Sequence, residues 1–321
     1  MNITDFFGRT FKTLRVSLTN RCNLACIYCM DPLAGDKTSL FPIPEKRTPL
    51  ANYQYLEIIK VLHHILGFDT IRLTGGEPTV YKSLIPLLDG LSELKINAIK
   101  MTSNGYLLSN KAEELKKAGL TAINISLDAL DPEVFFAINK RQGLSKVLSG
   151  IEKSIEAGIK VKINCVVMKG VNDNQILKLL DYCKELKISI RFLELMQMGH
   201  LHHNFQEVFF SEEQILKTIS QAYNLTSTLR GESATAKYWI TDGGYEFGII
   251  SNESDPFCND CNRLRLDSYG NVFGCLSDNN AINISDCIHD LSAVRKRLEQ
   301  ALAQKKTKFS GSELSMLHIG G

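Results

Sequence analysis

Six of the nine cysteines fall into two groups of three, and their spacing suits metal chemistry. They are Cys22, Cys26 and Cys29 in the stretch CNLACIYC, followed far along the chain by Cys258, Cys261 and Cys275. Thiolates are ligands of zinc and of iron–sulfur clusters. A closed structural zinc site takes four ligands, whereas three ligands leave one position open for chemistry. The CxxxCxxC spacing therefore favours an iron–sulfur cluster in which one iron lacks a protein ligand.

The second group has the form CxxC followed, after a longer interval, by one more cysteine, which indicates a second cluster with an open iron. The alternative is a zinc ribbon that takes a fourth ligand from Cys287 or His289, although the spacing to Cys287 is irregular for such a site. Cys165 and Cys183 lie singly in apolar patterns. We expect them to be small core residues.

Composition indicates a globular protein rather than a membrane protein or a general polyanion binder. Of the 321 residues, 44% are hydrophobic and 22% are charged. The net charge of +2 gives no general affinity for nucleic acid, so phosphate recognition would depend on locally placed Arg and Lys. No stretch approaches the ~18 apolar residues of a membrane helix, and the first residues lack a signal-like apolar region. We expect a cytoplasmic protein that binds neither nucleic acid nor membrane.

Short apolar or β-branched runs alternate with longer segments of helical period, which is typical of βα units with parallel strands. The expected strands are 14–18, 70–74, 97–102, 122–127, 160–167 and 188–194. The expected helices are 52–66, 83–94, 109–118, 144–157 and 173–186. Six such units predict an α/β fold, an incomplete (βα)6 barrel of the TIM type.

After about residue 205 this rhythm fades into a helix at 211–222 and two β-like runs near 236–240 and 245–250. We expect two regions, a barrel core and a C-terminal extension that packs on it and carries the second cysteine group. Their expected bounds are 1–224 and 225–321.

Small, polar or Gly-rich segments follow the expected strands. They are 19–29, 75–78, 102–105, 126–128 and 194–196. In parallel βα folds the loops at the carboxyl ends of the strands converge and form the active site. We therefore expect these segments to share one rim of the barrel.

The first cysteine group resembles the signature of the radical S-adenosylmethionine (SAM) superfamily, with the aromatic Tyr28 before its last cysteine. Gly75–Pro78 resembles the GGEP motif of the same superfamily. The resemblance implies that the open iron binds SAM and that cleavage of SAM yields a 5'-deoxyadenosyl radical. It also implies SAM contacts at the backbone of Tyr28, at Gly76, at Ser126 and at Met196.

Stretches along nearly the whole chain resemble the GTP 3',8-cyclase (MoaA) family of molybdenum cofactor biosynthesis. They are INISLDALD at 123–131, KINCVVMKGVND at 162–173, RFLELM at 191–196, CNDCNRLRLDSYGNVFGCL at 258–276, and the final Gly320-Gly321. The resemblance implies a lyase that converts GTP to (8S)-3',8-cyclo-7,8-dihydroguanosine 5'-triphosphate. The implied cofactors are SAM and two 4Fe-4S clusters, one on each cysteine group.

The resemblance also implies the residues that handle GTP. The implied GTP-binding residues are Arg15, Arg72, Thr102, Lys162, Arg263, Leu264 and Arg265. The implied catalytic residues are Arg263, Arg265, Gly320 and Gly321. Arginines offer forked donors to phosphate oxygens and a lysine offers a compact charge. Leu317 stands where the family usually has Ser, which leaves the route of the tail open.

The implied partners are cyclic pyranopterin monophosphate synthase, which takes the product, an electron donor such as flavodoxin or ferredoxin, and a second copy of the chain in a homodimer. Two other hypotheses stay open at this point. One is a radical SAM enzyme that modifies a peptide or a sugar and uses an auxiliary electron-transfer cluster. The other is a zinc-stabilised nucleotide-binding or regulatory protein without catalysis.

Overall fold

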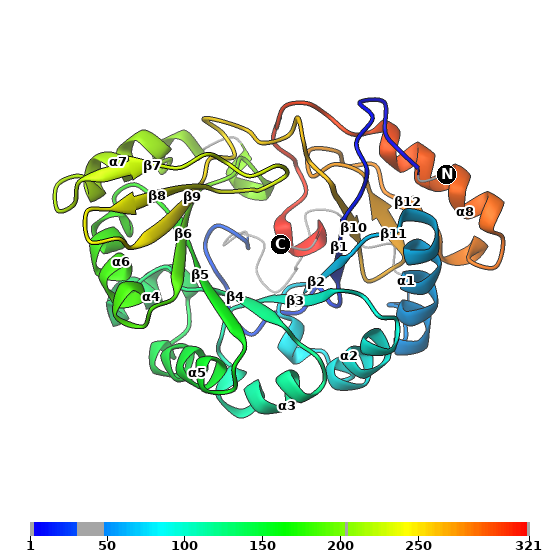
Figure 1. Ribbon diagram of the computed structural model, residues 1–321, viewed down its shortest axis with the longest axis horizontal. Helices are drawn as coiled ribbons and strands as arrows, with labels where there is room; N and C mark the ends of the chain where they lie inside the picture. The colour runs from blue at the N-terminus through cyan, green and yellow to red at the C-terminus, as the bar shows by residue number, and fades with distance from the viewer. Residues whose placement is uncertain (1–2, 31–47, 203–204, 320–321) are drawn as a thin grey trace.

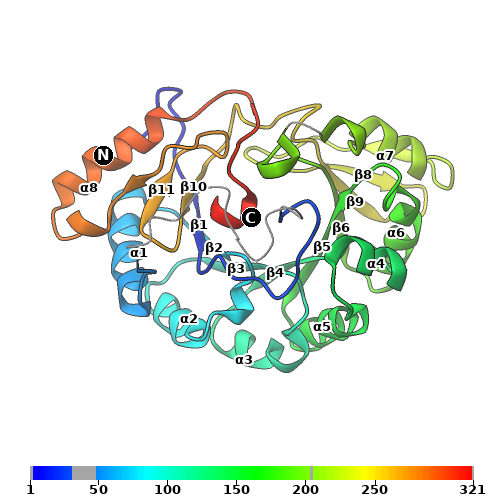
Figure 2. The ribbon, with the colours of Figure 1, turned by 180° about the vertical axis from the view of Figure 1, so that it is seen from behind.

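The computed structural model describes residues 3–30, 48–202 and 205–319. In these ranges a curved sheet of parallel strands carries helices on its outer side (Figures 1 and 2). Its central strands are β1 (Thr13–Ser17), β2 (Thr70–Thr74), β3 (Ala98–Ser103), β4 (Ala122–Ser126), β5 (Lys160–Val167) and β6 (Ser189–Glu194). The outer helices are α1 (Asn52–Leu66), α2 (Leu84–Glu93), α3 (Ala112–Lys117), α4 (Pro132–Asn139), α5 (Leu144–Glu156) and α6 (Ile176–Glu185). The predicted incomplete barrel is confirmed.

The six predicted strands are confirmed to within one residue at each end. The helices predicted at 109–118 and 173–186 begin later, because each is preceded by a separate 3-10 turn. Helix α4 is not predicted by the sequence pattern. It has eight residues, too few for a clear helical period, and its start depends on the carboxylate of Asp131 accepting from the backbone N–H groups of Glu133 and Val134.

Side chains on the parallel strands alternate between a buried face and a half-buried face. Leu14, Ile71 and Ile99 belong to the apolar core together with the helices. Their neighbours Arg15 and Arg72 point the other way, into the barrel. A TIM barrel interior is normally filled by branched apolar residues, so this polar interior leaves room for a ligand.

The C-terminal part of the chain lengthens the sheet at both edges. Strand β9 (Glu246–Ile250) pairs with β6 in parallel, and β10 (Arg263–Leu266) pairs with β1 in parallel. The remaining elements are α7 (Glu212–Ile219), β7 (Leu225–Ser227), β8 (Lys237–Thr241), β11 (Asn271–Phe273), β12 (Ile282–Asn283), α8 (Leu291–Ala303) and α9 (Met316–Ile319). The extension thus packs on the barrel as predicted, while the boundary at 224/225 stays a prediction.

The pairing of β10 with β1 places the two cysteine groups at opposite ends of the barrel. Thr13 lies opposite Arg263, and Arg15 lies opposite Arg265. The first cysteine group follows the carboxyl end of β1, whereas Cys261 precedes the amino end of the parallel strand β10. The segments after β1–β6 share the expected rim, but the second cysteine group lies at the other one.

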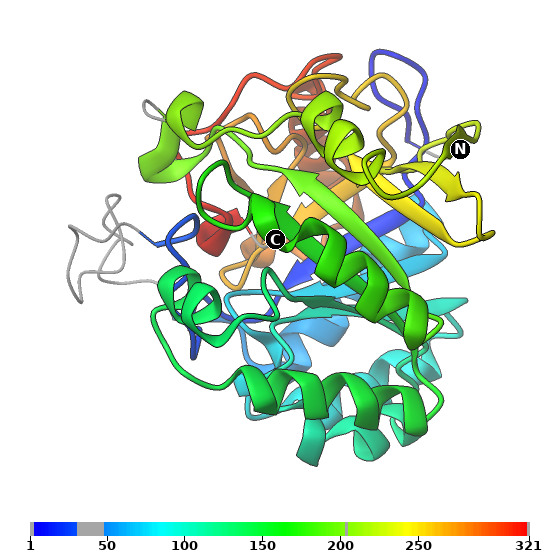
Figure 3. The same ribbon diagram turned by 90° about the vertical axis from the view of Figure 1, so that its left-hand side faces the viewer.

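Helix α9 lies inside the barrel, near the segment that follows β1 (Figures 1 and 3). The backbone of Leu317 lies beside the Cys29 thiol and lowers its pKa, against the larger effect of burial. The end of the described chain therefore reaches the first cysteine group. Among the helices of the described ranges, none is both long and apolar enough to cross a membrane.

Two helical glycines give a matched test of the packing. A Cβ on Gly150 in α5 would lie 2.4 Å from the carbonyl oxygen of Gly105, whereas a Cβ on Gly90 in α2 would meet the tip of Leu56, a flexible side chain, at 2.7 Å. Alanine is favoured over glycine in a helix by about 1 kcal/mol, but overpacking against backbone costs about 1–3 kcal/mol. We expect Gly150→Ala to lower the free energy of unfolding and Gly90→Ala to leave it unchanged or raise it. Equal effects in chemical denaturation would contradict the packing.

Candidate functional site

The GGEP turn after β2 holds the segment that leads to the first cysteine group. The N–H of Gly76 donates to the carbonyl oxygen of Thr19 at 2.6 Å, and the N–H of Glu77 donates to that of Arg21 at 2.9 Å. A Cβ on Gly76 would lie 2.4 Å from the Arg21 carbonyl oxygen. Glycine is therefore needed for the close approach of the two backbones, while the SAM contact at Gly76 stays a prediction.

The buried carboxylate of Glu77 joins the ends of β2 and β3. It accepts from the N–H and hydroxyl of Thr79 at 3.0 and 2.6 Å, from the Ser103 hydroxyl at 2.8 Å and from the Asn104 N–H at 2.7 Å. The Asn104 amide nitrogen lies 3.7 Å from the Cys22 sulfur. Burial raises the pKa of Glu77, and these donors oppose that shift. The glutamate of the motif thus positions the loops around the first cysteine group.

The three thiols of the first group lie near one another. Burial, and to a lesser extent the charge of Cys22, raises the pKa of Cys29 to about 12. Burial, and to a lesser extent the charge of Cys29, raises the pKa of Cys26. The Cys26 thiol donates to the side-chain oxygen of Asn139 at 3.0 Å. No three His, Cys, Asp or Glu side chains of the described ranges converge on the position of a single metal ion. The donor set, three neighbouring thiols on one short loop, fits the implied cluster.

Tyr28 is anchored through its side chain. Its hydroxyl donates to Asp128 at 2.8 Å, and the other Asp128 oxygen accepts from the N–H of Val166 at 2.8 Å. The backbone of Tyr28 is thereby held beside the end of β4, where Ser126 lies. Met196, which follows β6, packs against the apolar cluster that contains Ile319. The SAM contacts implied for Tyr28, Ser126 and Met196 stay predictions.

The thiols of the second group are also neighbours, and positively charged side chains lie beside them. The Lys305 ammonium donates to the Cys261 sulfur at 3.3 Å and to the carbonyl oxygen of Arg263 at 2.5 Å. Although burial opposes the shift, the charges of Arg263 and Lys305 lower the pKa of Cys261 to about 6. Burial, Cys261 and Cys275 raise the pKa of Cys258 to about 11. A thiolate at Cys261 suits a metal ligand.

Cys287 does not belong to this group. Its thiol donates to the carbonyl oxygen of Ile284 at 3.5 Å, and its charged neighbours are Arg297, Asp286 and Asp290. The structure therefore does not support the zinc ribbon that would use Cys287. Cys165 and Cys183 are fully buried, which confirms them as core residues.

Two side chains that the sequence does not single out hold the loop of the second group. The Arg9 guanidinium donates to the carbonyl oxygen of Cys258 at 2.5 Å. The Asp260 carboxylate accepts from both nitrogens of the Arg230 fork at 3.2 and 2.9 Å, and from the N–H of Ser233 at 2.7 Å. Neither Arg9 nor Arg230 lies near Cys258 in the sequence, so only the fold reveals these contacts.

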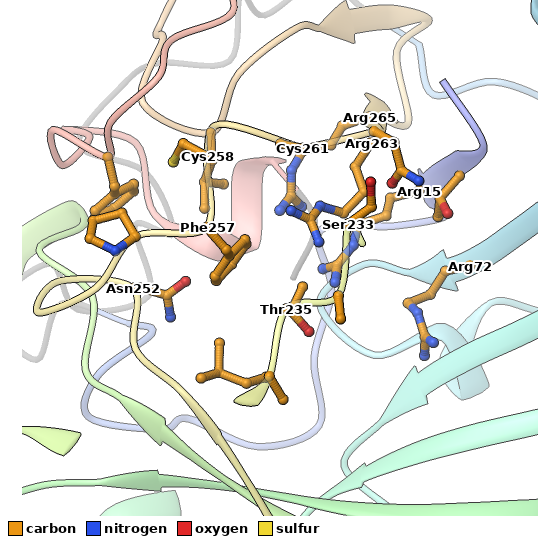
Figure 4. A pocket seen from close by; sticks show the side chains of 18 of the residues that line it. Arg15, Arg72, Ser233, Thr235, Asn252, Phe257, Cys258, Cys261, Arg263 and Arg265 are labelled. Carbon is orange, nitrogen blue, oxygen red and sulfur yellow. The ribbon is translucent and has the colours of Figure 1, made fainter. Parts of the chain in front are cut away.

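A cavity of about 470 Å³ occupies the barrel interior, with the second cysteine group in its wall (Figure 4). Its basic lining residues are Arg15, Arg72, Lys100, Arg191, Arg263, Arg265, Lys305 and Lys306. Arg15 lies directly between Arg265 and Arg72, and Lys100 follows on β3. The pairing of parallel strands thus sets a row of positive charges across one wall.

Four of the arginines that line the cavity lack carboxylate partners. Within the described residues, none of Arg15, Arg72, Arg191 and Arg263 forms an ion pair with Asp or Glu. Burial, and to a lesser extent the charge of Arg191, lowers the pKa of Arg72 to about 10. Burial and the charge of Arg263 lower the pKa of Arg265 to about 10 as well. Burial, Arg265 and Arg72 lower the pKa of Arg15 well below its ordinary value. Buried charges need compensation, so the cavity is built for an anion.

The predicted GTP-binding residues are distributed as follows. Arg15, Arg72, Thr102, Arg263 and Arg265 line the cavity. Lys162 donates to the hydroxyl of Tyr238, a cavity residue, at 3.0 Å. Leu264 packs in the core on the other face of β10. Gly320 and Gly321 lie outside the described residues.

Arg191 and Lys305 line the cavity and are not predicted as site residues. Arg191 stands in the RFLELM motif on a predicted strand. A basic residue inside a barrel strand is a signal by which Arg191 could have been predicted as a site residue. Lys305 lies well beyond Cys275 in the chain, after α8, and nothing local distinguishes it from other lysines.

Asp128 makes stability depend on pH. Burial raises its pKa to about 6 from the ordinary 3.8, and the hydrogen bonds of Tyr28 and Val166 oppose the shift. The folded state therefore holds the proton more tightly, and the free energy of unfolding should fall by about 3 kcal/mol as pH rises from about 4 to about 6. Asp128→Asn should remove this fall, while exposed Asp89→Asn should keep it. Parallel denaturation curves for metal-free wild type and Asp128→Asn would contradict this.

Two family models cover the chain in sequence. Residues 16–183 match the Radical SAM superfamily, and residues 188–311 match Molybdenum Cofactor Synthesis C. The GTP 3',8-cyclase of Helicobacter pylori strain HPAG1 is 37% identical over 309 residues, covering 95% of this chain and 94% of the relative. That of Clostridium botulinum strain Hall is 38% identical over 331 residues, covering 99% of each.

A solved structure, Streptococcus suis SuiB bound to S-adenosylmethionine, has a TM-score of 0.65 at 18% identity. It covers 92% of this chain and 68% of SuiB, and this likeness concerns the fold. The near full-length relatives set aside the peptide or sugar modifier and the non-catalytic zinc protein. The implied cofactors, SAM and two 4Fe-4S clusters, agree with the donor sets above. This chain belongs to the GTP 3',8-cyclase family, radical SAM enzymes of molybdenum cofactor biosynthesis.

Proposed function

We propose that the basic cavity binds GTP with its triphosphate on the arginine row and its guanine toward the second cysteine group. The buried guanidinium groups of Arg15, Arg72, Arg191 and Arg263, which lack carboxylate partners among the described residues, carry this proposal. Arg15, Arg72 and Arg265 are neighbours in register, and four of the cavity arginines have no acidic partner among the described residues. A volume of about 470 Å³ lies within the range of ligand pockets. A highly charged anion would relieve the repulsion between these side chains.

The cysteines divide the cofactors between the two ends. Cys22, Cys26 and Cys29 would hold the cluster that binds SAM, and the second group would hold the other cluster. When bound, SAM and the first cluster supply the one-electron chemistry that starts ring closure between C3' and C8 of GTP. The chain's own contribution is to fix the nucleotide between the two ends and to exclude water.

Individual residues would divide this work. Arg263 and Arg265 leave the second cysteine group on β10 and would hold GTP close to it. Arg72, Thr102 and Lys162 would orient the nucleotide from the neighbouring strands. Their forked or compact charges suit phosphate oxygens.

The tail is proposed to complete the site. Met316 lines the cavity and the backbone of Leu317 contacts Cys29. Gly320 and Gly321, which follow this segment in the sequence, are proposed to take part in catalysis. Their small size would let the backbone approach the substrate closely.

The finer predictions about partners also belong here. We propose that flavodoxin or ferredoxin supplies electrons, that cyclic pyranopterin monophosphate synthase takes the product, and that the protein acts as a homodimer. A cytoplasmic location is supported by nine unpaired thiols, which suit a reducing compartment. The division into a core at 1–224 and an extension at 225–321 is retained as part of the same proposal.

Arg72→Met tests the triphosphate site. Removing one partner of a buried charge contact costs about 2 kcal/mol or more, so the dissociation constant for GTP should rise about 30-fold or more. Guanosine, which lacks phosphates, should bind wild type and variant equally. Titration calorimetry on anaerobically reconstituted protein measures both, with exposed Lys82→Met as the charge-matched control.

The same preparation, given SAM, a reductant and GTP, should form the 3',8-cyclo product. Unchanged GTP affinity in Arg72→Met, or an equal loss for guanosine, would contradict the placement of the triphosphate. Wild-type protein that neither binds GTP nor forms product would contradict the proposed function as a whole.

A further inference from the structure

We propose that Asn252 is a specificity-determining residue that reads the guanine base. Its side-chain amide would accept from the 2-amino group of guanine and donate to the adjacent ring nitrogen N3. This inference rests on the proposed function, because it requires GTP to lie in the cavity with the base toward the second cysteine group.

Asn252 is a buried polar side chain without a partner. It is 8% exposed and lines the cavity, yet its amide makes no hydrogen bond with any of the described residues. Asn164, another cavity residue, differs because its oxygen accepts from the Arg191 guanidinium at 3.0 and 2.7 Å. The amide atoms of Asn252 are open to the cavity rather than sealed in the protein interior, so a ligand that pairs with both of them in place of water gains selectivity.

Asn252 lies at the end of the cavity where the proposal places the guanine base. Figure 4 shows its amide pointing into the cavity from the side opposite Arg15 and Arg72, on the same side as Phe257 and Cys258. The arginine row would hold the phosphates, so a nucleotide spanning the cavity presents its base toward Asn252. The ring of Phe257 adds an apolar surface on that side, with the Arg263 guanidinium 4.7 Å from its centre.

The backbone that carries Asn252 is held firmly. The buried carboxylate of Glu194 accepts from the N–H groups of Glu253 and Ser254, each at 3.0 Å. The Glu253 carboxylate in turn accepts from the N–H of Gln197 at 2.9 Å. A residue that recognises a base must keep its position without the ligand, and these bonds supply that rigidity.

The chemistry of an amide suits guanine in particular. An amide carries one acceptor and two donors in a plane, and the 2-amino group and N3 of guanine offer a donor and an acceptor side by side. Hypoxanthine lacks the 2-amino group, so it would leave the Asn252 oxygen unpaired. The residue would therefore select GTP over inosine triphosphate (ITP).

The test compares GTP with ITP as substrates of the reconstituted enzyme. Wild type should prefer GTP in kcat/KM. In Asn252→Leu and Asn252→Ala the ratio of kcat/KM for GTP to that for ITP should fall about tenfold or more, because GTP loses the contacts at both the 2-amino group and N3 whereas ITP loses only the contact at N3. Alanine guards against a steric effect of leucine. Exposed Asn280→Leu is the control and should keep the wild-type ratio, and iron content and GTP-independent SAM cleavage should be equal in all four proteins.

An unchanged ratio in Asn252→Ala, with wild-type GTP turnover, would overturn the role of Asn252 and leave the proposed function intact. Equal losses with GTP and ITP would also overturn it, because they indicate a contact other than the 2-amino group. Wild type that binds no GTP would overturn the proposed function, and this inference with it.

Discussion

The parallel pairing of β10 with β1 is the constraint on which the site depends. These strands lie near opposite ends of the chain, and their register sets Arg265 beside Arg15. Because both strands run in the same direction, a cysteine before β10 and a cysteine after β1 must lie at opposite ends of the barrel. A shift of one residue would turn Arg263 and Arg265 away from the interior and Leu264 into it. One strand pairing therefore sets both the separation of the cysteine groups and the charge between them.

Three buried carboxylates of the protein position loops. Glu77 binds the turn after β2 to the end of β3, Asp128 holds Tyr28, and Glu194 holds the segment that carries Asn252. Each accepts at least one backbone N–H, which gives a charged acceptor at little conformational cost. Since these acids face backbone, they leave Arg15, Arg72, Arg191 and Arg263 without an acidic partner among the described residues. The positions of these three acidic residues therefore both hold the loops and leave the four arginines unpaired.

The barrel could be predicted because its strands carry strong local patterns. LRVSL, TIRLT and KVKINCVV are apolar or β-branched runs bounded by helical periods, and both cysteine groups are short motifs. The helix and the two β runs predicted between 211 and 250 correspond to α7, β8 and β9, but the elements from β10 onward could not be predicted, since β10 has four residues and is stabilised by pairing with a distant strand. For the same reason the roles of Arg9, Arg230 and Lys305 depend on contacts between distant parts of the chain, which no local pattern reports. Arg15 and Arg72 could be predicted as site residues because the strands and motifs that carry them could be predicted.

The row of buried arginines also links the stability of the protein to its nucleotide supply. An empty cavity leaves like charges side by side, which works against the folded state. A ligand that binds only the folded protein adds about 1.4 kcal/mol to the free energy of unfolding for each tenfold excess over its dissociation constant. The folded fraction of the enzyme should therefore depend on the concentration of the nucleotide that fills its cavity.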